Sequence, residues 1–118
     1  MKGRKESDIQ RAILDYLKRR GIMAWRQKSE GTWDAARGIY RRGTGTPGLP
    51  DIGGILPGTS GYDFNDMGRA LQIEVKAGRN KPSLEQINFL AAAREAGAVA
   101  FVAYSVEDVI EKMKEEGL

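Results

Sequence analysis

Apolar side chains recur every three or four residues near the start of the chain, which is the spacing of an amphipathic α-helix. The pattern predicts a first helix from Ser7 to Arg20, with Ser7 as its N-cap and Gly21 as its stop. Its inward positions would be Ile9, Ile13, Leu14 and Leu17.

Two further helices are predicted by the same spacing and by their end signals. One runs from Ser83 to Ala96 and is ended by Gly97, and the other runs from Val106 to Glu116 with Ser105 as its cap. The expected inward side chains of the second helix are Leu84, Ile87, Leu90 and Ala91.

Short apolar runs between these helices predict four strands, namely Ile22–Arg26, Asp51–Leu56, Ala70–Lys76 and Val99–Tyr104. Residues 28–50 are rich in Gly, Thr and Arg and are expected to form a long loop. The turn-forming residues 57–69 predict a hairpin between the second and third strands. The expected order is α-β-β-β-α-β-α, an α/β fold in a single domain over residues 1–118.

The chain contains neither cysteine nor histidine. Disulfides, thiolate zinc sites, cysteine nucleophiles and Ser-His-Asp triads are therefore excluded. Metal binding would have to use oxygen ligands, which favour Mg²⁺ or Mn²⁺. No apolar run approaches the ~20 residues of a membrane span, and the N-terminus lacks the apolar region of a secretory signal. We therefore expect a cytoplasmic protein with no membrane partner.

The net charge of +3 is unevenly distributed along the chain. Residues 1–46 hold 12 Lys and Arg against 5 Asp and Glu, a net of +7, whereas residues 47–118 hold 7 against 11, a net of −4. A basic half joined to an acidic half is typical of a phosphate-binding surface beside a metal site. The alternative is chance clustering of charges on a solvated face.

Two acidic residues and a lysine form the candidate chemistry. Glu74 and Lys76 are two positions apart on an expected strand, so their side chains share a face. Asp51 begins the neighbouring expected strand, where a hairpin would bring its carboxylate beside Glu74. Paired carboxylates are typical of sites that hold a cation between them, and Lys76 would orient a water molecule or stabilise developing negative charge. The alternative is that Glu74 and Lys76 are ordinary exposed strand residues and that Pro50-Asp51 is turn chemistry.

Three short motifs follow one another in the sequence: Gly48-Leu49-Pro50-Asp51, Ile73-Glu74-Val75-Lys76 and Gln86-Ile87-Asn88-Phe89. Together they resemble the signature of the PD-(D/E)XK nuclease superfamily and, more narrowly, the VRR-NUC (virus-type replication-repair nuclease) domain. The likeness extends to residues 6–10 and 98–109. It implies a restriction-endonuclease-like core, with a mixed central sheet flanked by helices, and a metal-dependent DNA endonuclease activity.

The resemblance also implies roles for individual residues. Asp51, Glu74 and the main-chain carbonyl of Val75 would ligate Mg²⁺ or Mn²⁺, Lys76 would lie near the attacking water, and Glu6 would support the metal site. Glu6 has an independent argument, because a helix starting one turn earlier would place it on the apolar stripe, where a charge needs a partner. The alternative is that Glu6 only favours the helix dipole.

Gln86 has two interpretations. The resemblance places it at the catalytic site, whereas Ser83-Leu84-Glu85-Gln86 fits a capping box in which Gln86 would reach back to the Ser83 amide. Local sequence alone supports the second role, so both interpretations stay open.

Basic and aromatic residues of the first half are candidates for contact with DNA: Arg26, Lys28, Trp33, Arg37, Tyr40, Arg41 and Arg42. Trp33 and Tyr40 would either stack on unpaired bases or hold the loop against the core. The resemblance further implies a branched DNA substrate such as a Holliday junction, a symmetric homodimer and a phage or prophage origin. The alternatives are a non-catalytic DNA-binding module and a component of a restriction system.

Overall fold

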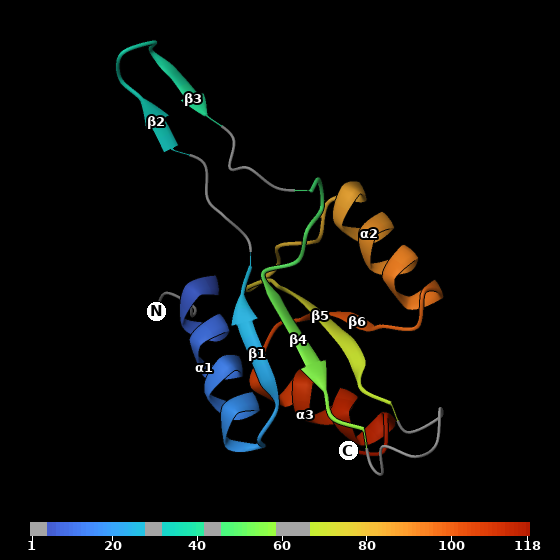
Figure 1. Cartoon of the computed structure of the whole chain (residues 1–118). Helices are drawn as coiled ribbons and strands as arrows, with labels where there is room; N and C mark the ends of the chain where they lie inside the picture. The colour runs from blue at the N-terminus through green and yellow to red at the C-terminus, as the bar shows by residue number, and fades with distance from the viewer. Residues whose placement is uncertain (1–4, 28–31, 42–45, 59–66) are drawn as a thin grey trace.

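The computed structural model (Figure 1) describes residues 5–27, 32–41, 46–58 and 67–118, with the backbone alone described at 32–34, 40 and 41. Along the chain these residues form α1 (Glu6–Arg19), β1 (Met23–Arg26), β2 (Thr32–Asp34), β3 (Ile39–Arg41), β4 (Ile52–Leu56), β5 (Arg69–Val75), α2 (Leu84–Glu95), β6 (Val99–Ala103) and α3 (Val106–Glu115). In this described part of the chain, no helix has the length and apolarity needed to cross a lipid bilayer.

The central sheet contains β1, β4, β5 and β6 in that order. Strand β4 is antiparallel to both β1 and β5, whereas β6 runs parallel to β5. The prediction of an α/β fold with a mixed central sheet flanked by helices is therefore confirmed. The expected turn at 57–69 lies largely outside the described residues.

The predicted order of elements is wrong in one segment. Part of the expected loop at 28–50 forms β2 and β3, which pair with each other in a separate two-stranded sheet, so the observed order is α-β-β-β-β-β-α-β-α. The physical reason is local: strand-forming Thr, Trp, Ile and Tyr flank a turn at 35–38 that ends on Gly38, which has a φ of 65°. The Gly- and Arg-rich composition of the whole segment conceals these two short runs.

The main core lies between the sheet and the helices α1 and α3, which contact each other on one face of the sheet (Figure 1). It includes Ile9, Ile13, Leu17, Ile52, Leu71, Ile73, Val75, Val109 and Met113. Because strand residues alternate faces, Gln72 and Glu74 of β5 lie on the opposite face, where α2 packs on β5 and β6. The candidate carboxylate Glu74 therefore faces a different layer from the apolar residues beside it in the sequence.

Helix α1 begins one residue earlier than predicted, and its cap is not Ser7. The N-cap is Lys5, which makes no side-chain capping bond. Its main-chain carbonyl accepts hydrogen bonds from the amides of Asp8 and Ile9 at 3.0 and 3.2 Å. Ser7 lies inside the first turn, so its side-chain oxygen is not at the capping position.

The inward face predicted for α2 is also wrong in part. Leu90 is buried as expected, but Leu84 and Ile87 are 72% and 46% exposed, and Gln86 is buried instead. Apolar residues occur on several sides of this helix, so their spacing cannot select which face meets the sheet. The buried Gln86 instead donates a hydrogen bond to Glu74 of β5.

Two leucines of α2 test this orientation. We expect Leu90→Ala to lower the free energy of unfolding by about 2–5 kcal/mol, because it opens a cavity in a buried region. Leu84→Ala, in the same helix, should change it by less than about 0.5 kcal/mol. Urea unfolding followed by tryptophan fluorescence measures both variants, and equal losses would contradict the observed orientation.

Candidate active site

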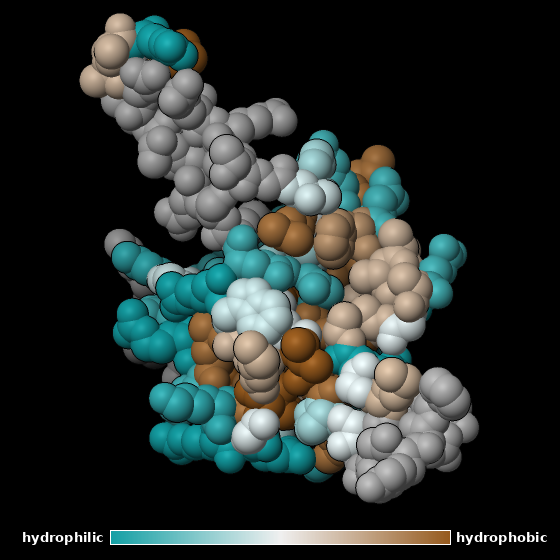
Figure 2. Space-filling model, in the orientation of Figure 1, coloured by the Kyte–Doolittle hydropathy of each residue, from teal (hydrophilic) through white to brown (hydrophobic). Residues whose placement is uncertain are grey.

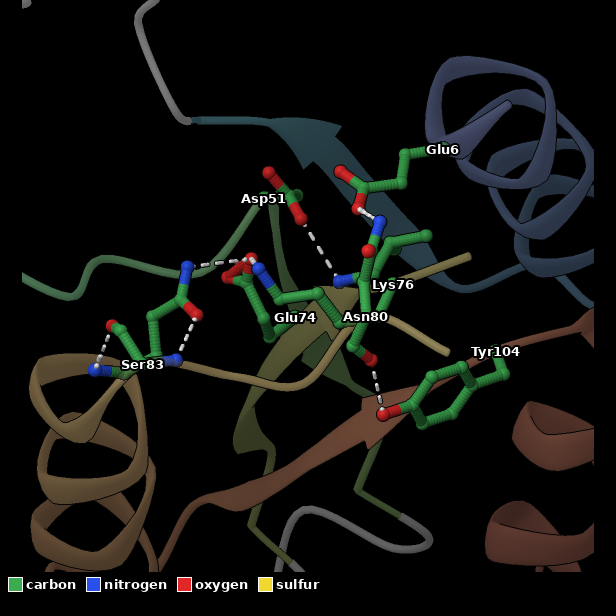
Figure 3. A network of polar contacts seen from close by, with 9 residues as sticks. Glu6, Asp51, Glu74, Lys76, Asn80, Ser83 and Tyr104 are labelled. Carbon is green, nitrogen blue, oxygen red and sulfur yellow. Dashed lines mark hydrogen bonds and ion pairs between the residues drawn. The ribbon is translucent and has the colours of Figure 1, made fainter. Parts of the chain in front are cut away.

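The candidate site lies where β4 begins and β5 ends. Asp51 was expected to be the first residue of the strand, but it lies immediately before β4. Lys76 lies immediately after β5. The antiparallel register pairs Ile52 with Ile73, so continuing it by one residue places Asp51 opposite Glu74. Figure 3 shows both side chains at this end of the sheet.

Asp51 is held from two sides by main-chain groups. One oxygen of its carboxylate accepts a hydrogen bond from the amide of Val75 at 2.8 Å, and its main-chain carbonyl accepts one from the amide of Gln27 at 3.0 Å. The residue is 6% exposed. Its carboxylate is thus fixed against the end of β5, next to the peptide that joins Glu74 to Val75.

Glu74 is a buried carboxylate, 1% exposed. Its Oε1 accepts a hydrogen bond from Nε2 of Gln86 at 3.0 Å and lies 3.8 Å from Nζ of Lys76. Burying a charge is costly unless charged or hydrogen-bonding groups compensate it. The predicted common face of Glu74 and Lys76 is present, and the pair is largely removed from water, because the Lys76 side chain is only 15% exposed.

Gln86 forms the predicted capping box, and its side chain also contacts Glu74. Its Oε1 accepts a hydrogen bond from the amide of Ser83 at 2.8 Å, and its own amide donates to Oγ of Ser83 at 3.2 Å, which completes a capping box. Because Oε1 of Gln86 accepts from the main-chain amide of Ser83, its Nε2 group is the one that faces Glu74. The start of α2 therefore presents a hydrogen-bond donor to the buried carboxylate.

Gly48 places the segment before Asp51 against the same helix. It has a φ of +76°, and a Cβ at this position would lie 2.2 Å from the carbonyl oxygen of Glu85 and 3.0 Å from the amide nitrogen of Gln86. Glycine is therefore required both for the backbone conformation and for the close approach. Sequence reasoning quoted Gly48 as part of a motif but missed this packing role, whose signal is the glycine itself.

Glu6 forms a different contact from the one expected. Its Oε1 accepts a hydrogen bond from Nδ2 of Asn80 at 3.4 Å, and the main-chain carbonyl of Asn80 accepts one from the hydroxyl of Tyr104 at 2.7 Å (Figure 3). Within the described ranges, no three acidic side chains are grouped closely enough to hold a metal ion together. The structure thus brings Asp51 and Glu74 together without Glu6. Asn80 and Tyr104 were missed, because the sequence gives no signal for a contact between distant loops.

The oxygen donors at this site suit a hard divalent cation. Asp51 and Glu74 supply carboxylates from facing positions, and the carbonyl of Val75 lies between Glu74 and Lys76 in the chain. Mg²⁺ and Mn²⁺ prefer oxygen ligands and commonly use one or two carboxylates with further oxygens from water and substrate. The residues present therefore fit such an ion.

The basic residues proposed to contact DNA are only partly described. Arg26 is exposed at the end of β1, where its guanidinium donates to the main-chain carbonyl of Ser7 at 3.4 Å, and Arg37 is exposed in the turn between β2 and β3. Trp33 and Tyr40 are backbone partners in that hairpin. Arg41 lies in β3, and Lys28 and Arg42 fall outside the described residues. The described members of this set lie in β1 and in the β2–β3 hairpin.

A pair of glycine variants tests the packing of Gly48. We expect Gly48→Ala to destabilise the fold by more than Gly21→Ala, because both glycines have left-handed φ values, +76° and +72°, but a Cβ on Gly21 meets nothing within 4 Å. The left-handed conformation alone costs about 1–2 kcal/mol for a non-glycine residue. Thermal or urea unfolding gives both losses, and the close approach to Glu85 is refuted if they are equal.

Comparison of the chain with protein-family models, with curated proteins and with solved structures found no match. The buried carboxylates and the adjacent lysine are therefore the ground for a functional proposal.

Proposed function

We propose that this protein is a Mg²⁺- or Mn²⁺-dependent endodeoxyribonuclease with a restriction-endonuclease-like core of the PD-(D/E)XK type. The observation that carries the proposal is the arrangement of Asp51, Glu74 and Lys76. Two largely buried carboxylates lie where β4 begins and β5 ends, and an ammonium group lies 3.8 Å from one of them. A stable fold gains little from placing these charges together, since an apolar pair of similar volume would often be at least as stable.

Each side chain of the site has a task in phosphodiester hydrolysis. Asp51, Glu74 and the carbonyl of Val75 would hold the divalent cation, which supplies Lewis-acid stabilisation of charge on the phosphate. Lys76 would stabilise the negative charge that develops as water attacks phosphorus. Gln86 is a positioning residue, because its amide donates to Oε1 of Glu74. Preorganised groups of this kind stabilise a transition state without having to rearrange during the reaction.

The charge distribution supports DNA as the substrate. The basic first half, with a net of +7 over residues 1–46, would attract a polyanion and contact its phosphates. We extend the proposal to branched DNA, in particular four-way junctions, and to a symmetric homodimer, because two copies would cut a two-fold symmetric junction at paired positions.

One observation favours a non-catalytic DNA-binding module as the second candidate. Among the described residues no three acidic groups cluster as metal ligands, and Lys76 lies near Glu74 as an ordinary ion pair would. In that case the same basic half would bind phosphates, and the carboxylates would serve only the fold.

Cleavage assays on two site variants separate these candidates. With Mg²⁺ or Mn²⁺ present, we expect Lys76→Ala and Asp51→Ala to slow cleavage of a labelled four-way junction by at least about 100-fold. Lys114→Ala, an exposed lysine of α3, is the matched control and should cut like the wild type. If both site variants cut as fast as the control, the nuclease assignment is wrong. Circular dichroism checks that each variant is folded.

Sedimentation equilibrium tests the proposed assembly. At micromolar concentration we expect a mass twice the 13.0 kDa of one chain. A single species of 13.0 kDa, together with equal cleavage of junctions and linear duplexes, would count against a junction-specific dimer but would leave the hydrolytic site untouched.

A further inference from the structure

Half of the sheet face that carries Glu74 has no helix over it among the described elements. Helix α2 packs on β5 and β6, while β1 and β4 expose Met23, Trp25 and Ile55 at 65%, 40% and 47%. Figure 2 shows this area as apolar surface at the centre of the view, over β1 and β4. Polar surface surrounds much of it, so the area is a bounded patch that a ligand could cover.

The indole of Trp25 lies close to the backbone of Gly53, which has no side chain to displace it. A Cβ on Gly53 would lie 3.1 Å from Nε1 of Trp25 and 2.1 Å from the side-chain oxygen of Gln27, so both side chains lie directly over the Gly53 backbone. The amide of Gln27 donates to Oε1 of Gln72, and Gln72 borders a cavity of about 350 Å³ between β5 and α2. The indole of Trp25 and the carboxamides of Gln27 and Gln72 therefore lie next to one another on this face, and we call the three side chains the shelf.

This shelf and the candidate active site are on the same side of the sheet. The register places Trp25, Gly53 and Gln72 side by side across three strands, and Glu74 is two residues beyond Gln72 on β5. Two strand spacings amount to roughly 10 Å and two residues along a strand to roughly 7 Å. A nucleotide adjoining a phosphate held at Asp51 and Glu74 can therefore reach the ring.

We propose that Trp25 is the stacking platform for an unpaired base of the DNA strand bound at Asp51 and Glu74, with Gln27 and Gln72 facing the edge of that base. The inference rests on the proposed function and narrows its substrate to DNA with unpaired bases near the cleavage point. An exposed aromatic face stacks on any base, and carboxamides match the donors and acceptors of base edges. The net charge of +7 over residues 1–46, which include Trp25, suits a polyanion better than an apolar protein partner.

Fluorescence without metal tests the contact independently of cleavage. The chain has two tryptophans, so Trp33→Phe leaves Trp25 as the sole reporter. In EDTA, titration with single-stranded oligothymidine should quench this emission, whereas a blunt duplex should not. This titration involves neither a metal ion nor hydrolysis. A negative cleavage assay would therefore leave the quenching result valid, and absence of quenching would leave the cleavage result valid.

Substitutions on β1 give the matched comparison. Trp25→Ala should weaken binding of the oligonucleotide about 5- to 100-fold and leave duplex binding unchanged, while Trp25→Phe should retain most of the affinity. Met23→Ala, on the same strand and the same face, should bind like the wild type. If a non-cooperative unfolding curve shows that Trp25→Ala is not properly folded, the test of stacking by Trp25 relies on two other measurements. These are the affinity of Trp25→Phe and the quenching of the Trp33→Phe chain.

Three results would overturn the proposal. The first is absence of quenching in the Trp33→Phe chain, and the second is an equal loss of affinity in Trp25→Ala and Met23→Ala. The third is a wild-type dimer that both β1 variants dissociate, because the patch would then be covered by a second copy of the chain.

Discussion

The burial of Glu74 is the constraint on which the rest of the site depends. A carboxylate that is 1% exposed must be compensated, and here the amide of Gln86 and the ammonium of Lys76 both approach the same oxygen. Because Gln86 also forms the capping box with Ser83, the start of α2 is bound to the end of β5. The buried carboxylate of Glu74 thus connects the end of β5 with the start of α2 and with Lys76.

The position of Asp51 follows from the same arrangement. Asp51 lies outside the strand itself, so strand pairing alone does not fix its carboxylate, and the amide of Val75 holds it instead. Gly48 brings the preceding turn against Glu85 and Gln86 of α2, at a distance that a Cβ would prevent. Helix α2 therefore contacts the segment before Asp51 and also the end of β5 at Glu74, so a shift of this helix would disturb both carboxylates.

Sequence patterns predicted what depends on neighbouring residues. The two-residue period of a strand was enough to predict that Glu74 and Lys76 share a face. The sequence Ser83-Leu84-Glu85-Gln86 likewise predicted the capping box. What failed depends on tertiary contacts. The pattern gave Leu84 and Ile87 an inward position because it could not show that a polar residue, Gln86, meets the sheet.

Sequence patterns did not predict the contacts between segments that are far apart in the chain. Nothing in the order of residues indicates that Glu6 pairs with Asn80, or that Tyr104 closes on the same turn. The β2–β3 hairpin was missed for a different reason, since its strands are three residues each and lie within a segment whose composition is that of a loop. Short strands carry too few positions for the alternation of apolar and polar residues to be detected.

The layering of the domain limits how a substrate could reach the buried carboxylates. Helices α1 and α3 cover one face of the sheet, and α2 covers the other face over β5 and β6, with Gln86 directly on Glu74. Among the described elements, no helix covers β1 and β4 on the Glu74 side of the sheet (Figure 1). A polymer bound at Asp51 and Glu74 would therefore extend over the half of the sheet that carries Trp25.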